Sequence, residues 1–411
     1  MASLKSRVAV VAATLAAGAA VLVAIPAQAG PSPAAPARVA ADFYTPPSPL
    51  PSGQDGDVIR SEPMLVHAGL QAKAQRIMYL SRDARGEPMA VTGTALTPHT
   101  PWIGLGKRPV IGYAVGTQGM ADHCAPSKQL EIGIEYEGVY IAGLLARGYG
   151  VVVSDYQGLG TPGVHTYVNR TAQGNAVLDS VRAAQRLPAA GLPDDGPVVT
   201  FGYSQGGGAS ASAAELQPTY APELKLKGAY AGAPPADLKA VGRSLDGSYA
   251  ATLLGYAVVG LEAAYPEQID LDDYLNDRGK QLFEQAKNSC LIDGLLLGAF
   301  SQSKDLTKDG RPVSEYMDEE PFDSLVTDQQ LGKRKPAAPV LVLHSAQDDI
   351  VPFEQGRQMA QDWCGRGAKV RFQSLQLPTH VGAIPNTAPY VFPWLESVVA
   401  GIPLPSNCGS F

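Results

Sequence analysis

The fold of this 411-residue chain is best inferred from one segment, Val198-Val199-Thr200-Phe201-Gly202-Tyr203-Ser204-Gln205-Gly206-Gly207-Gly208. It begins as a short apolar run, which predicts a buried strand, and an alanine-rich stretch that predicts a helix follows over 209–216. Between them Ser204 stands in the pattern G-x-S-x-G, the signature of a sharp strand-to-helix turn that exposes a nucleophilic serine. Glycine suits this turn because side chains two residues either side of the serine would collide across it. A glycine-rich turn with a chance serine is the alternative.

Other short apolar runs lie on both sides of this segment and alternate with helical stretches. Strands are predicted at 109–115, 150–154, 228–232, 339–344 and 370–377, and a helix at 174–186. This alternation indicates an α/β fold with a mostly parallel sheet and helices on both faces. It stops over 238–335, which is rich in Leu, Ala and acidic residues. We therefore expect one domain, built from 58–237 and 336–411, with 238–335 inserted late in the sheet order as a helical cap.

The first 57 residues fall outside this pattern. Residues 1–29 combine a basic start, a weakly apolar run and the small-residue ending Ala27-Gln28-Ala29, which together predict a cleaved secretory signal peptide. A permanent membrane anchor is the alternative, because the apolar run approaches the length that spans a bilayer. Residues 30–57 are rich in proline and predict an extended arm, with Phe43 and Tyr44 as its candidate docking points. We expect a secreted, extracellular chain with no stable membrane span after cleavage.

Charge and cysteine content narrow the range of functions. The chain has 32 Lys and Arg against 39 Asp and Glu, a balance that argues against nucleic-acid recognition. Export exposes a protein to an oxidising compartment, so Cys124, Cys290, Cys364 and Cys408 are expected to form disulfides. Zinc binding is the alternative, but no two of the cysteines have C-x-x-C spacing. Spacing alone leaves all three disulfide connectivities open.

The pattern around Ser204 is typical of the α/β-hydrolase fold, in which an acid and then a histidine follow the serine in the chain. Of the histidines, only His344 and His380 follow Ser204. We interpret His344 as structural, because it lies within a predicted strand end and precedes the candidate acids. His380 follows the next predicted strand and is the candidate base. Asp348 and Asp349 share one turn, and spacing does not choose between them; an ordinary solvated turn carboxylate is the alternative for either.

Several motifs together resemble the secretory lipase family of α/β-hydrolases, known from fungi and actinobacteria. They are Gly112-Tyr113-Ala114-Val115-Gly116-Thr117-Gln118-Gly119 with Cys124-Ala125-Pro126-Ser127, GYSQGG at 202–207, HSAQDDIVP at 344–352 and THVG at 379–382. The resemblance covers nearly the whole chain after residue 29 and includes the cap. It implies that Asp348 is the acid, because the family's D-x-x-V-P pattern begins there. It also implies the disulfides Cys124–Cys290 and Cys364–Cys408.

The expected chemistry is hydrolysis of carboxylic esters, most of all acylglycerols, through an acyl-enzyme on Ser204. An oxyanion hole needs two backbone N–H groups; Gln205 is expected to supply one, and the resemblance implies Gln118 for the other. We expect no cofactor and no metal, a lipid or other ester as substrate, and transient contact with a lipid interface. The alternatives are a general carboxylesterase, an acyltransferase, or a non-catalytic binding protein on the same fold. Asn169-Arg170-Thr171 also fits an N-glycosylation sequon.

Overall fold

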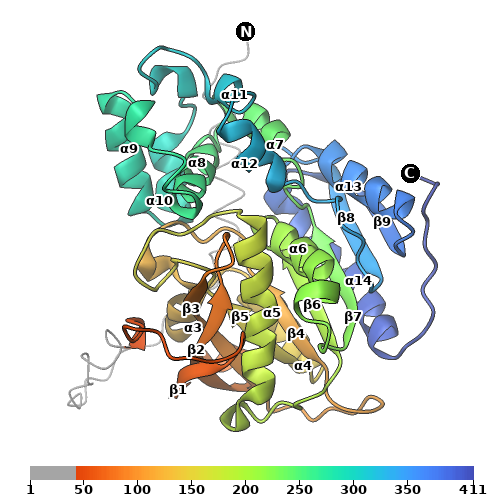
Figure 1. Ribbon diagram of the computed structural model, residues 1–411. Helices are drawn as coiled ribbons and strands as arrows, with labels where there is room; N and C mark the ends of the chain where they lie inside the picture. The colour runs from red at the N-terminus through yellow and green to blue at the C-terminus, as the bar shows by residue number, and fades with distance from the viewer. Residues whose placement is uncertain (1–42) are drawn as a thin grey trace, which may run out of the picture. The chain divides into compact units, whose positions relative to one another are not determined.

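The computed structural model describes residues 43–411, so the predicted signal peptide and residues 30–42 of the proline-rich arm lie outside the described residues. The described chain forms a nine-stranded sheet in the order β1-β2-β3-β5-β4-β6-β7-β8-β9 (Figure 1). The strands are β1 (Val58–Met64), β2 (Ala72–Arg82), β3 (Pro88–Pro98), β4 (Val110–Ala114), β5 (Gly150–Ser154), β6 (Val198–Tyr203), β7 (Leu226–Gly232), β8 (Val340–Gln347) and β9 (Val370–Pro378). The fold is thus α/β-hydrolase-like, as expected.

The sheet has an antiparallel and a parallel part. Strands β1, β2, β3 and β5 pair antiparallel, whereas the ladders from β5 through β4, β6, β7 and β8 to β9 are parallel. Every residue of β4, β5 and β6 is buried, as is typical of parallel strands covered on both faces. The parallel part therefore brings the carboxyl ends of β6, β8 and β9 to one edge of the sheet.

Helices cover both faces of this sheet (Figure 1). They are α3 (Pro126–Ile132), α4 (Gly138–Ala146), α5 (Arg170–Arg186), α6 (Gln205–Tyr220), α13 (Phe353–Gly365) and α14 (His380–Val399). In Figure 1 α5 and α6 cross the near face, while α4 and α14 lie behind it. Asn169 caps α5 by accepting a hydrogen bond from the Ala172 amide, and it is 2% exposed. The possible sequon asparagine is therefore a buried cap in the folded chain.

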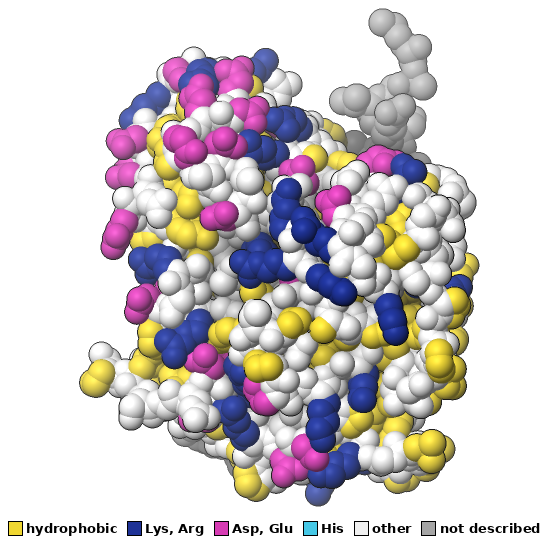
Figure 2. Space-filling view, turned by 45° about the vertical axis from the view of Figure 1, so that its right-hand side comes forward, with side chains coloured by type: hydrophobic (Ala, Val, Ile, Leu, Met, Phe, Trp, Pro, Cys, Tyr) yellow, Lys and Arg dark blue, Asp and Glu magenta, His cyan; other side chains and the backbone are white. Residues whose placement is uncertain are grey.

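The segment between β7 and β8 is helical and has an apolar core of its own. Its helices are α7 (Leu238–Leu245), α8 (Thr252–Ala264), α9 (Asp277–Lys287), α10 (Leu291–Gly298), α11 (Val313–Tyr316) and α12 (Phe322–Asp328). They build the lobe at the upper left of Figure 2, where Asp and Glu are interspersed with Lys and Arg. Ion pairs such as Arg243–Asp318 at 2.8 Å lie on this surface. We call this segment the cap; its boundaries as a domain stay a prediction.

Helix α10 packs against the rest of the cap through its glycines and through the partly buried Leu291 and Leu295, but it leaves other large apolar side chains exposed. Gly294 and Gly298 are buried against α8, whereas Ile292, Leu296 and Phe300 are 54, 77 and 63% exposed. Large apolar side chains normally face the core of an amphipathic helix. Leu296 and Phe300 are therefore exposed to solvent rather than packed on α8.

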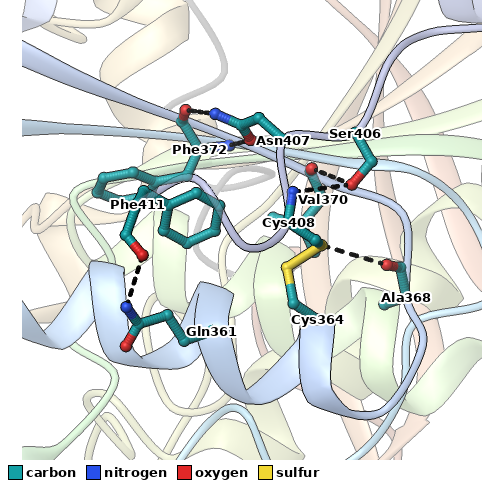
Figure 3. Close-up of a disulfide and its surroundings, with 9 residues drawn as sticks. All are labelled: Gln361, Cys364, Ala368, Val370, Phe372, Ser406, Asn407, Cys408 and Phe411. Atoms are coloured by element: carbon teal, nitrogen blue, oxygen red, sulfur yellow. Dashed lines mark hydrogen bonds between the residues drawn. A yellow bond between two sulfur atoms is a disulfide. The ribbon is translucent and has the colours of Figure 1, made fainter.

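Both ends of the described chain are attached to the sheet. At the N-terminal end Phe43 and Tyr44 are buried, and the Tyr44 hydroxyl lies 2.9 Å from Ser127 Oγ. At the C-terminal end Asn407 pairs with the edge strand β9, where its side chain bonds the backbone N–H and C=O of Phe372 (Figure 3). A covered edge cannot pair with another chain. The tail thus closes one edge of the sheet.

Two disulfides join distant segments, and their pairing is the one that the family resemblance implies. Cys124 is bonded to Cys290, and Cys364 is bonded to Cys408 (Figure 3). The first bond links the loop after β4 to the start of α10, and the second holds the C-terminal tail against α13. Within residues 43–411, no helix combines the length and the apolar character needed to cross a bilayer.

Candidate active site

Ser204 occupies a strained turn between β6 and α6. Its backbone has φ 59° and ψ −126°, a conformation that L-residues rarely adopt. Its amide donates to the Gly232 carbonyl at 2.9 Å, which attaches the turn to the end of β7. A Cβ on Gly202 would collide with the backbone of Gly206, and a Cβ on Gly206 would collide with the Ala114 carbonyl. The G-x-S-x-G glycines are therefore required by backbone crowding, as the pattern predicts.

Asp348 and His380 meet at the ends of β8 and β9. The Nδ1 atom of His380 lies 2.7 Å from Asp348 Oδ2, and the other carboxylate oxygen accepts from the amides of Ile350 and Val351. Burial alone would raise the pKa of Asp348, but hydrogen bonds from His344 and His380 outweigh it and lower that pKa. The Asp348 carboxylate is therefore ionised at neutral pH and oriented toward the imidazole.

The two neighbouring aspartates contact different parts of His380. Whereas Asp348 holds the ring, Asp349 Oδ1 accepts a hydrogen bond from the His380 backbone amide at 2.8 Å. His344 is fully buried; its Nε2 lies 3.0 Å from the Val351 carbonyl and 3.4 Å from Asp348 Oδ2. Of the two aspartates, Asp348 contacts the His380 ring and Asp349 contacts its backbone, while the buried His344 lies beside Asp348.

Tyr203, the residue before Ser204, contacts His380 and so brings the histidine close to the serine turn. The Tyr203 hydroxyl donates to the His380 carbonyl at 2.8 Å, and the two rings lie 5.1 Å apart. His380 Nε2 is buried and has no hydrogen-bond partner within residues 43–411. No hydrogen bond joins it to Ser204 Oγ in this part of the chain. Such contacts often tighten only when substrate binds.

Two segments carry backbone N–H groups that could donate hydrogen bonds to a negative charge developing beside Ser204. Gln205 opens α6, and Gln118 lies in the loop after β4; both are buried, and neither backbone N–H has a partner within residues 43–411. Residues 118–120 pair with the start of α10, where Gln118 accepts from the Leu291 amide at 2.8 Å. A Cβ on Gly119, whose φ is +127°, would meet the backbone of Cys290. The loop is therefore packed tightly against the cap.

Sequence reasoning missed three residues beneath this loop. Glu135, Tyr136 and Glu137 contact residues 116–118, and both glutamates are buried. Burial raises the pKa of Glu135 to about 7 and that of Glu137 well above its ordinary value. Two acids in a short segment resemble an ordinary solvated loop in the sequence, so only their burial in the structure distinguishes them.

An apolar cavity of about 450 Å³ opens at Ser204. It is lined by Ser204 and Gln205, by Ile350 and Val351 next to the candidate acid, and by side chains of α7 and α8. A second cavity of about 670 Å³ lies within the cap and shares Leu238, Leu254 and Ala257 with the first. Apolar cavities with few polar groups are typical of small-molecule sites. Adjoining apolar cavities therefore lie at Ser204 and inside the cap.

The described residues contain one group with metal-ligand character, His123, Cys124 and Cys290. Its two cysteines are joined in a disulfide. A bonded sulfur is no thiolate ligand, so this group fits a covalent link better than a metal site.

A strained serine after a central strand, with an acid and a histidine after later strands, defines an α/β-hydrolase. The secretory lipase family model matches residues 124–407, and the chain belongs to this family of ester hydrolases. A probable inactive lipase of Mycobacterium tuberculosis is 30% identical over 88% of this chain and 82% of its own length. A secreted triacylglycerol lipase of Malassezia furfur is 29% identical over 78% of this chain and 85% of its own length.

Solved structures agree with this assignment. The closed state of Candida antarctica lipase A superposes with a TM-score of 0.80 at 25% sequence identity, covering 90% of this chain and 87% of that chain.

Proposed function

We propose that this chain is a secreted serine hydrolase that cleaves acylglycerol esters with Ser204, His380 and Asp348. The observation that carries the proposal is the arrangement of His380. Its Nδ1 is held by an ionised carboxylate, while its Nε2, next to the strained serine turn, has no hydrogen-bond partner within residues 43–411. An imidazole fixed at one nitrogen and free at the other is what a general base beside a nucleophile needs.

In the proposed reaction Ser204 Oγ attacks the ester carbonyl carbon, and His380 Nε2 takes the hydroxyl proton. Asp348 stabilises the imidazolium ion, and the amides of Gln205 and Gln118 stabilise the oxyanion. The C–O bond to the alcohol then breaks, and His380 returns the proton to the leaving alkoxide. Water repeats the sequence on the acyl-enzyme, which releases the carboxylic acid and restores Ser204.

The apolar cavities favour a substrate with a long acyl chain. The cavity at Ser204 adjoins the second cavity inside the cap, and side chains of α7 and α8 line both. A third, also apolar, shares Leu254 and Phe283 with the second. Each buried methylene contributes about 0.8 kcal/mol. A chain that extends from Ser204 into the cap would therefore bind more tightly as it lengthens.

The exposed face of α10 supports contact with a lipid surface. Ile292 and Leu296 of α10, and Phe300 just after it, are exposed, and the first residue of this helix donates to the Gln118 carbonyl. An apolar surface beside a site is typical of an interaction surface. The formal net charge of −7 disfavours anionic lipids and favours a neutral or zwitterionic surface.

Leu296→Ser combined with Phe300→Ser tests this surface. We expect binding to phosphatidylcholine vesicles to fall at least about tenfold, with unchanged turnover of a water-soluble short ester. The control Ile402→Ser changes a 56% exposed residue beyond α14 and should leave binding unchanged. If the double variant bound vesicles as well as the Ile402→Ser control, α10 would not be the lipid-contacting surface.

The name of the mycobacterial relative raises the alternative of a non-catalytic protein on this fold. A missing or displaced side chain would favour it, but this chain has all three side chains, and Asp348 and His380 are in contact. The decisive variants are Ser204→Ala and the matched pair Asp348→Asn and Asp349→Asn. Activity is measured on p-nitrophenyl esters of increasing chain length, below and above micelle formation.

We expect Ser204→Ala to abolish hydrolysis and Asp348→Asn to lower kcat about 10⁴-fold. Asp349→Asn should change kcat only a few-fold, because an amide oxygen can still accept from the His380 backbone. Retained hydrolysis by Ser204→Ala would overturn the proposed mechanism. A flat response to chain length would change the substrate from lipid esters to short esters, and ester formation with an added alcohol would indicate acyl transfer.

Secretion rests on the predicted signal peptide and on relatives that are named secreted lipases. We expect the exported chain to begin at Gly30, which N-terminal sequencing of protein from the culture medium would test.

A further inference from the structure

Three consecutive side chains contact three consecutive residues of the loop after β4. Glu137 accepts a hydrogen bond from the Gly116 amide at 2.7 Å. The Tyr136 hydroxyl donates to the Thr117 carbonyl at 3.2 Å. The side-chain amide of Gln118 donates to Glu135 Oε1 at 3.1 Å. The segment 135–137 therefore runs along the loop 116–118 and contacts each of its residues in turn.

This segment is positioned by the helices on either side of it. It lies between α3 and α4, and the Glu135 carbonyl accepts from the amide of Gly138, the first residue of α4. On the other side of the loop, Thr117 Oγ1 lies 2.6 Å from the Tyr167 hydroxyl. The loop is thus held from two directions, and the acidic segment provides one of them.

The two glutamates are buried, and no cationic side chain among the described residues pairs with them. Glu135 is 7% exposed and Glu137 is 4% exposed. The groups that act on them are each other, Gln118, the Gly116 amide and the Tyr113 hydroxyl of β4, with no Lys or Arg among them. Glu135 Oε2 is a buried oxygen with no hydrogen-bond partner within residues 43–411. A buried carboxylate in such surroundings favours its protonated form.

We propose that Glu135, Tyr136 and Glu137 are positioning residues that aim the backbone N–H of Gln118 at the oxyanion, and that Glu135 must be uncharged for full activity. This inference rests on the proposed function, because it needs an oxyanion beside Gln118. A neutral carboxyl group still accepts from Gln118 through its C=O. An ionised one adds negative charge below the loop, where it opposes the charge that develops during ester cleavage.

A specific pH dependence follows from this arrangement. Since burial raises the pKa of Glu135 to about 7, the carboxyl group is neutral below that pH and ionises as the pH rises through it. The kcat of the natural chain should therefore fall on the alkaline side.

Glu135→Gln separates charge from contact, because the amide keeps an acceptor for Gln118 but cannot ionise. We expect its kcat to match the natural chain at pH 6 and to show no alkaline fall. Glu135→Ala removes the contact, and its kcat should drop about 10- to 100-fold with KM nearly unchanged. Glu267→Gln, an exposed glutamate in the cap, is the control and should behave like the natural chain.

An unchanged alkaline fall in Glu135→Gln would overturn the proposal. So would natural turnover by Glu135→Ala. If Glu135→Ala does not fold, the pH profile of Glu135→Gln decides alone. Retained hydrolysis by Ser204→Ala would instead show that the proposed function fails, so the two failures are distinguishable.

Discussion

Glycine serves opposite purposes in the serine turn and in helix α10. A side chain on Gly206 would collide with the carbonyl oxygen of Ala114, which belongs to the backbone of a central strand. A side chain on Gly298 would collide first with the Thr252 hydroxyl, which belongs to a side chain. In the turn glycine lets two backbones approach; in α10 it lets the helix bury its small face and expose Leu296. Backbone crowding cannot be relieved by another substitution, but side-chain crowding can.

The strongest test of this difference is Gly206→Ala. We expect it to lower the free energy of unfolding by about 3 kcal/mol, because the new methyl group forces a strand and a helix apart. A displaced serine turn should also lower kcat about 100-fold. Chemical denaturation and ester hydrolysis measure the two effects.

Gly208→Ala is the matched control, since its Cβ would lie 3.3 Å from the Pro235 side chain rather than against backbone. It should change stability by less than about 1 kcal/mol. Equal effects of the two alanines would show that the turn is not limited by backbone crowding.

A smaller effect is expected for Gly298→Ala in α10. Crowding against Thr252 should cost about 1 to 2 kcal/mol in thermal or chemical unfolding. Combining it with Thr252→Ala removes the hydroxyl that the methyl group meets, so the double variant should cost less than the sum of the single variants. Strict additivity would contradict a collision between these two residues.

The smallest effect, and the only stabilising one, is expected for Gly255→Ala in α8. A Cβ there would approach only Phe283, at 4.0 Å. Alanine favours the helix over glycine by about 0.5 to 1 kcal/mol, so the unfolding midpoint should rise. A fall would mean that α8 also needs glycine for close packing.

Much of the sheet could be predicted from the sequence, because buried parallel strands are continuous apolar runs. The predicted strand 150–154 coincides with β5. The prediction 109–115 is one residue longer than β4 at each end, and 370–377 is one residue shorter than β9 at its C-terminal end. The outward face of α10 could not be predicted. Apolar periodicity identifies a helix face but does not say whether that face meets the core or solvent.

The candidate site divides in the same way. Chain order and strand ends identified Ser204, Asp348 and His380 as candidates, because the acid and base follow successive strands of one sheet. The Tyr203–His380 contact joins residues 177 positions apart, and no local pattern encodes it. Glu135 was missed for a related reason, since charge in a sequence indicates solvent unless burial is known.

The two disulfides divide the chain into separate covalent rings. Residues 124–290 form one ring, which contains Ser204, and residues 364–408 form the other, which contains His380. Asp348 lies on the connecting segment, in neither ring. A protease cut inside either ring leaves one covalent molecule until the disulfide is reduced. A single cut between 291 and 363 instead yields two fragments, one with the serine and one with the histidine, which only non-covalent contacts such as the β7–β8 ladder keep together.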